Sequence, residues 1–71
     1  MSNLSLARQV KNAVVAQFGN EPWFAGAGAT REDGIGFVVK VRVRPGIPRP
    51  AGVPPEVIDG ITIQIVEASA G

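Results

Sequence analysis

Residues 35–44 read Ile-Gly-Phe-Val-Val-Lys-Val-Arg-Val-Arg, and this stretch decides the fold. Every second position is apolar, and most of the remaining positions carry a cation. The apolar set is Ile35, Phe37, Val39, Val41 and Val43, and the other set is Val38, Lys40, Arg42 and Arg44. Because successive side chains of a strand point to opposite faces, this alternation predicts a strand with one face on a core and one in water. A register slip of one residue would bury three cations, so the register is strongly specified.

The residues before this strand predict a hairpin. Residues 23–30 form an extended run, and Arg-Glu-Asp-Gly follows it at positions 31–34. An Asp-Gly pair between two extended segments favours a tight turn between antiparallel strands. The first of these strands is rich in glycine and alanine, which are poor strand formers. We interpret the small residues as space for a helix to lie close to the sheet, with Trp23 and Phe24 closing one end of the core.

The N-terminal segment predicts that helix. Apolar residues recur at steps of three and four from Ser5 onward, which is typical of one buried helix stripe. The stripe consists of Leu6, Val10, Ala13 or Val14, and Phe18. Gly19-Asn20 then ends the helix.

The C-terminal part contains one more strand and a long connection. Residues 61–67 alternate again, with Ile61, Ile63 and Ile65 on one face. The sixteen residues from Pro45 to Gly60 include five of the six prolines. Within them, residues 54–60 (Pro-Pro-Glu-Val-Ile-Asp-Gly) predict a short helical turn before the last strand, because proline suits the first position of a helix.

These elements together predict one α+β domain over residues 1–71. The N-terminal helix packs on a three-stranded sheet and covers the face formed by Ile35, Phe37, Val39, Ile61, Ile63 and Ile65. The position and direction of the third strand stay open, because a connection over residues 45–60 can reach either edge. We expect residues 68–71 to form a frayed tail.

The composition excludes much chemistry. The chain has 71 residues, no cysteine, no histidine and a net charge of +1. Ser-His and Cys-His nucleophiles and the usual zinc sites therefore cannot be built. We interpret the adjacent carboxylates Glu32 and Asp33 as turn residues, and Gly26-Ala27-Gly28 as a packing feature, since neither the Rossmann spacing nor a P-loop lysine follows. We expect no enzyme activity, no metal and no cofactor.

The same composition bears on the compartment. Arg8 and Lys11 interrupt the apolar N-terminus in a way unlike a signal peptide, and no run is long enough to span a membrane. The lack of cysteine fits a reducing cytoplasm.

The proline-rich connection is the predicted binding surface. Long irregular links are uncommon in small domains unless they are functional or disordered, and prolines keep the chain extended. We predict a non-catalytic module that binds a protein partner through Ile47, Pro48, Arg49, Pro50 and Val53. One alternative is nucleic-acid binding by Lys40, Arg42 and Arg44, although no aromatic residue is interleaved with them. A second is a protease inhibitor that presents an extended loop with Arg49 as its basic anchor. A homodimer through sheet pairing, with Val38 and Val66 on the outer face, is a further expectation.

Three short motifs carry a family resemblance. They are Trp-Phe-Ala-Gly-Ala-Gly at 23–28, Asp-Gly at 33–34, and Val-Pro-Pro-Glu-Val-Ile-Asp-Gly-Ile-Thr-Ile-Gln-Ile at 53–65. Between about Leu6 and Val66 the chain resembles the small domain that precedes some bacterial trypsin-like serine proteases. The proteolytic residues of such proteins lie in the following domain, so the resemblance implies an accessory or stand-alone relative and carries over no catalytic residue.

Overall fold

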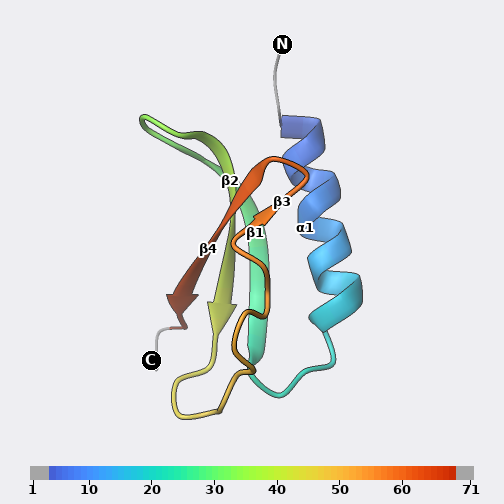
Figure 1. Ribbon diagram of the computed structural model, residues 1–71, viewed down its shortest axis with the longest axis vertical. Helices are drawn as coiled ribbons and strands as arrows, with labels where there is room; N and C mark the ends of the chain where they lie inside the picture. The colour runs from blue at the N-terminus through green and yellow to red at the C-terminus, as the bar shows by residue number, and fades with distance from the viewer. Residues whose placement is uncertain (1–3, 69–71) are drawn as a thin grey trace.

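A computed structural model describes residues 4–68 of the chain (Figure 1). It contains helix α1 (Leu4–Phe18) and strands β1 (Phe24–Glu32), β2 (Gly36–Val43), β3 (Val57–Ile58) and β4 (Ile61–Glu67). The strands form one sheet in the order β1-β2-β4-β3. The α+β class is confirmed, but the sheet is mixed and has four strands where the sequence predicts three.

The predicted hairpin between the first two strands is confirmed. β1 and β2 pair antiparallel, with Glu32 opposite Gly36 and Thr30 opposite Val38. The turn between them is closed by the Ile35 amide, which donates to the Glu32 carbonyl at 3.1 Å. Ile35 therefore belongs to the turn and is 57% exposed, so its predicted place on the core face is wrong. The reason is the backbone of Gly36, whose φ of 100° separates Ile35 from the regular strand.

The last strand lies beside β2 and runs parallel to it. Val39 pairs with Ile63 and Val43 with Glu67, and the Ala68 amide still donates to the Val43 carbonyl at 2.7 Å. Ala68 is thus held by β2, and the remainder of the predicted tail lies outside the described residues. Two adjacent parallel strands need a crossover connection that passes over one face of the sheet. Val53 and Ile58 pack against the core cluster, so this crossover runs on the same face as α1.

The predicted helical turn in residues 54–60 is wrong. Val57 and Ile58 form the short strand β3, which pairs antiparallel with Thr62 and Ile61 of β4. Asp59 and Gly60 connect the two strands with φ values of 51° and 81°. Positive φ at both central residues is the requirement of the two-residue hairpin turn that matches the twist of a sheet. The Asp-Gly pair thus marks a second hairpin.

The core lies between α1 and one face of the sheet. Ala7, Val10, Val14 and Phe18 are the buried residues of α1. They pack with Trp23, Phe24, Val39, Val41, Ile61 and Ile63. The ring centroids of Phe18 and Trp23 are 5.5 Å apart, and those of Trp23 and Phe24 are 6.1 Å apart. These rings close one end of the core, as expected.

The helix covers the sheet unevenly. It packs chiefly on β1 and β2 and touches β4 little. Ile61 and Ile63 are buried as predicted, but Ile65, which pairs with Val41 on the same face, remains 37% exposed. The prediction that the helix covers Ile65 is therefore wrong, because β4 continues past the cover that α1 provides.

Val38 departs from its predicted environment. It lies on the face opposite α1, as the alternation predicts, yet it is fully buried. β2 is an inner strand, so Val38 is flanked by Thr30 of β1 on one side and Thr62 of β4 on the other. The face away from the helix is therefore partly closed around Val38.

The contrast between Val39 and Ile35 gives a stability prediction. We expect Val39→Ala to lower the free energy of unfolding by about 2 kcal/mol, because it removes methyl groups from a fully buried site. Ile35→Ala should change it by less than about 0.5 kcal/mol, because the side chain is largely in water. Urea denaturation of both variants checks this. Equal losses of unfolding free energy in the two variants would contradict the start of β2 at Gly36.

Candidate binding surfaces

The face of the sheet away from α1 is the first candidate surface, because α1 and the crossover both pack on the other face (Figure 1). The strand registers fix which residues share this outer face. They are Gly26, Gly28, Thr30 and Glu32 of β1, Val38, Lys40 and Arg42 of β2, and Thr62, Gln64 and Val66 of β4. Cations, glycines and hydroxyl or amide groups thus predominate there.

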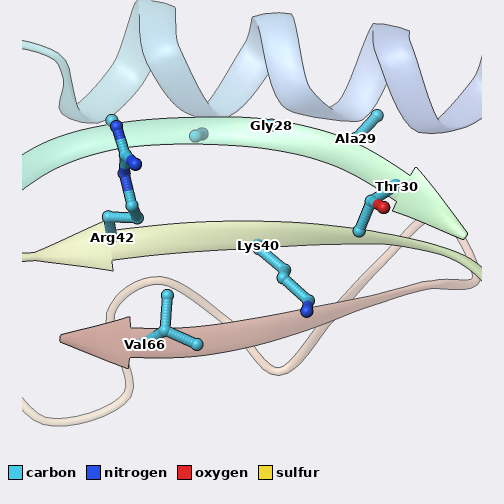
Figure 2. Close-up of a pocket in the computed structure, with 8 residues that line it drawn as sticks. Gly28, Ala29, Thr30, Lys40, Arg42 and Val66 are labelled. Carbon is cyan, nitrogen blue, oxygen red and sulfur yellow. The ribbon is translucent and has the colours of Figure 1, made fainter. Parts of the chain in front are cut away.

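An open depression of about 460 Å³ lies on the outer face (Figure 2). Residues 26–30 of β1 form its floor, and Lys40, Arg42 and Val66 form its walls. The register explains the hollow, since Gly26 is opposite Arg42 and Gly28 is opposite Lys40. Each large cationic side chain of β2 therefore has a neighbour on β1 with no side chain.

The two glycines of the floor differ in whether the structure requires a glycine. Gly26 has a φ of 155°, beside the irregularity in the β1–β2 register at Phe24/Gly26. A Cβ there would lie 3.7 Å from Nη2 of Arg42, so the guanidinium rests above this glycine. At Gly28 the φ is not in the left-handed region and a Cβ would meet nothing within 4 Å. Neither the backbone nor internal packing therefore requires a glycine at position 28.

The two cations of the depression differ in whether they have an acidic partner. The Lys40 ammonium lies 3.5 Å from the Glu32 carboxylate, and both side chains are about two-fifths exposed, at 41% and 38%. An ion pair between exposed side chains contributes little free energy. The Arg42 side chain makes no hydrogen bond or ion pair within residues 4–68. Figure 2 shows its side chain extending across β1, whereas Lys40 extends from β2 toward β4. Its guanidinium donors are thus available to an anion.

The predicted basic set is brought together in part. Lys40 and Arg42 line one depression, but Arg44 lies past the end of β2 and does not line it. Its backbone amide donates to the Trp23 carbonyl at 2.8 Å and its side chain is exposed.

The aromatic rings lie on the core side of the sheet. The sequence contains Phe18, Trp23, Phe24 and Phe37. The first three are buried and Phe37 packs against the core cluster. The outer face therefore offers no aromatic platform for stacking bases.

The proline-rich arm, residues 45–53, is the second candidate surface. It protrudes at the end of the sheet opposite the β1–β2 turn (Figure 1). Ile47, Pro48, Arg49 and Pro50 are exposed together, whereas Val53 is half-buried and packs against the core. Four of the five predicted partner-binding residues thus share one exposed segment, and Val53 anchors it.

A hydrogen bond holds the arm in shape. Nη1 of Arg49 donates to the Val53 carbonyl at 2.8 Å, and the Val53 amide donates to the Pro50 carbonyl at 3.3 Å. The guanidinium that the sequence marks as a free basic anchor is therefore engaged inside the arm. Sequence reasoning missed this contact because it depends on how the arm bends.

Within residues 4–68, no group of three or more acidic side chains gathers where a metal ion could be held. No helix of that segment is long and apolar enough to cross a membrane.

Comparisons with known proteins give no relative. No protein-family model matches the chain, and neither a curated protein nor a solved structure matches it.

The hydrogen bond from the Arg49 side chain to the Val53 carbonyl, here called the clamp, gives a prediction on backbone motion in the arm. We expect Arg49→Gln to increase backbone motion of residues 46–52 on the picosecond to nanosecond timescale, because the bond to Val53 is lost. Arg44→Gln is the matched control, since its side chain is exposed and has no such bond in the described residues. Amide ¹⁵N relaxation measures both, and unchanged order parameters in Arg49→Gln would refute the clamp.

The glycines give a prediction on stability. Gly28→Ala should leave the free energy of unfolding unchanged or raise it by up to about 1 kcal/mol, because the backbone is compatible and the space is open. Gly36→Ala should lower it by about 1–2 kcal/mol, because its φ of 100° is strained for any side chain. Thermal and urea unfolding of both variants test the difference. A large loss in Gly28→Ala would mean that position 28 is structurally required.

Proposed function

We propose that this chain is a non-catalytic protein-interaction module that presents its proline-rich arm to a protein partner. The observation that supports this most is the joint exposure of residues 47–50 on a segment clamped by Arg49 and anchored by Val53. A segment already held near one conformation loses less entropy on docking than a flexible loop.

The composition of the arm indicates how it would be recognised. Pro48 and Pro50 flank Arg49, and residues 48–50 belong to no helix or strand. Extended proline-rich segments dock in grooves lined by aromatic side chains on the partner. Ile47, at 36% exposed, supplies an apolar contact next to the prolines. The arm is thus the ligand, and the partner supplies the groove.

The kind of partner is suggested by the resemblance to the domain that precedes some bacterial trypsin-like proteases. An accessory or regulatory role toward such a protease is part of this proposal, and the cytoplasm is the compartment that we propose for it. Direct inhibition by an extended loop is the weaker form of the idea. The Arg49 guanidinium is bound to Val53 within the arm, so it would have to leave that bond to act as a basic anchor.

Nucleic-acid binding is a second candidate function with one supporting observation, the placement of Lys40 and Arg42 on one depression. Single-stranded nucleic acids are usually gripped by cations together with aromatic platforms. All aromatic rings of the chain lie on the core side, so the protein-binding proposal is better supported.

An affinity experiment tests the proposed function. The full chain is immobilised as wild type, as a variant with residues 47–50 replaced by Gly and Ser, and as the triple variant Lys40→Glu, Arg42→Glu, Arg44→Glu. We expect a partner from an extract of the source cells to be retained by wild type and the triple variant and lost from the arm variant, because only the latter lacks the stiff prolines.

Two other outcomes would contradict the arm as the binding surface. Loss in the triple variant alone would overturn the arm as the binding surface and place it on the basic face. Retention of the same protein by all three baits would exclude both surfaces. Circular dichroism and thermal unfolding of each bait control for folding.

A further inference from the structure

The free edge of β1 adjoins the depression on the outer face. β1 is the first strand in the sheet order, so it pairs with β2 on one side and with no strand of residues 4–68 on the other. Alternate residues of such a strand direct their N–H and C=O groups away from the sheet. On the opposite edge of the sheet, β3 has two residues and pairs only with Ile61 and Thr62 at the start of β4. β1 has nine, long enough to pair with an extended chain.

The Arg42 guanidinium lies where it can meet a chain bound at that edge. It rests above Gly26, a residue of the edge strand itself. A strand added beside β1 would lie about 4.8 Å from it, the normal spacing between neighbouring strands. A carboxylate on the outer face of the added strand then reaches the guanidinium with no side chain of β1 between them. Arginine and carboxylate form paired, charge-assisted hydrogen bonds in this arrangement.

Gly28 leaves room for the next side chain on the same face. Residues two apart on a strand share a face, so a side chain that follows the first lies above Gly28. The space above Gly28 is open and belongs to the depression.

We propose that the β1 edge and the depression together bind an extended acidic segment of a partner protein. The segment adds to the sheet as a further strand, an acidic side chain lies over Gly26 and contacts Arg42, and the next side chain on that face lies over Gly28. Backbone pairing supplies affinity, and Arg42 selects a carboxylate at the position over Gly26.

Charge and composition favour this occupant over two others. A nucleic acid has phosphates for the cations, but the outer face has no aromatic ring for its bases and carries Glu32 beside Lys40. A second copy of this chain could pair through β1. Its outer-face residues on β1 are Gly26, Gly28, Thr30 and Glu32, so it brings one carboxylate together with the cations Lys40 and Arg42 of its own β2. An acidic segment brings a carboxylate and no cation, so its charge complements this face better.

The test uses a synthetic peptide, blocked at both ends, in which glutamate alternates with valine. Binding to the full chain is measured by calorimetry and by the NMR shifts of the β1 amides. We expect the shifts of Gly26, Gly28 and Thr30 to change. The same peptide with glutamine for glutamate should bind about tenfold more weakly, because it cannot form the charge-assisted bonds. A version with alternate backbone amides methylated should also lose binding, since it cannot pair with an edge strand.

Variants of the chain locate the site. Arg42→Gln should lower the affinity for the glutamate peptide about tenfold. Arg8→Gln makes the same charge change at an exposed position of α1, and it should leave the affinity within twofold of wild type. Gly28→Val should lower the affinity as well, because the added side chain fills the space above β1, and its folding is checked by thermal unfolding. Replacing residues 47–50 by Gly and Ser should have no effect on peptide binding, which separates this inference from the proposed role of the arm.

Several results would overturn the inference. These are absence of binding, equal affinity for the glutamine or methylated peptide, and equal weakening by Arg8→Gln. Tighter binding of a single-stranded oligonucleotide, lost in Arg42→Gln, would assign the face to nucleic acid. Concentration-dependent dimers in light scattering that disappear in Gly28→Val would assign the edge to a second copy.

Discussion

The position of β2 between two other strands is the constraint on which the rest of the structure depends. Val38, Val39 and Val41 are all fully buried: Val38 lies between residues of β1 and β4 on the outer face, and Val39 and Val41 lie in the core with α1. In a chain of 71 residues without cysteine, this strand and the helix stripe that covers it supply most of the buried apolar surface. The alternation of apolar residues and cations along β2 fixes its register, and that register places Lys40 and Arg42 opposite the glycines of β1.

Parallel pairing of β2 with β4 explains the long connection between them. Adjacent parallel strands cannot be joined by a tight turn, so the chain must pass over a face of the sheet and return. Most small domains use a helix for this purpose, whereas here an irregular, proline-rich segment does so and contributes Val53 and Ile58 to the core. Part of its length is therefore a structural requirement. The exposed residues 47–50 lie before this packed portion, and they are the part available for a partner.

The two faces of the sheet differ in how they are covered. The inner face is covered by α1 and by the crossover except near Ile65, and all the aromatic rings are on that side. The outer face has small residues on the edge strand and long cationic side chains on the strand beside it. One fold thus exposes two surfaces of unlike chemistry: a proline-rich arm at one end of the sheet and a cationic depression on the outer face. They lie on different residues and can be tested independently.

The sequence by itself determined the helix, the β1–β2 hairpin, the strand at residues 61–67 and the α+β class, because these follow from local periodicity and from turn residues. It indicated the arm through its prolines, and four of the predicted partner-binding residues are exposed together. The environments of Ile35, Ile65 and Val38, the second hairpin at Asp59-Gly60 and the parallel direction of β4 came only from the tertiary structure. The depression also came only from it, since Gly26 and Arg42 are distant in the chain and meet through strand pairing. Local patterns report what each segment prefers, whereas the neighbours that a side chain meets depend on how strands far apart in the sequence align.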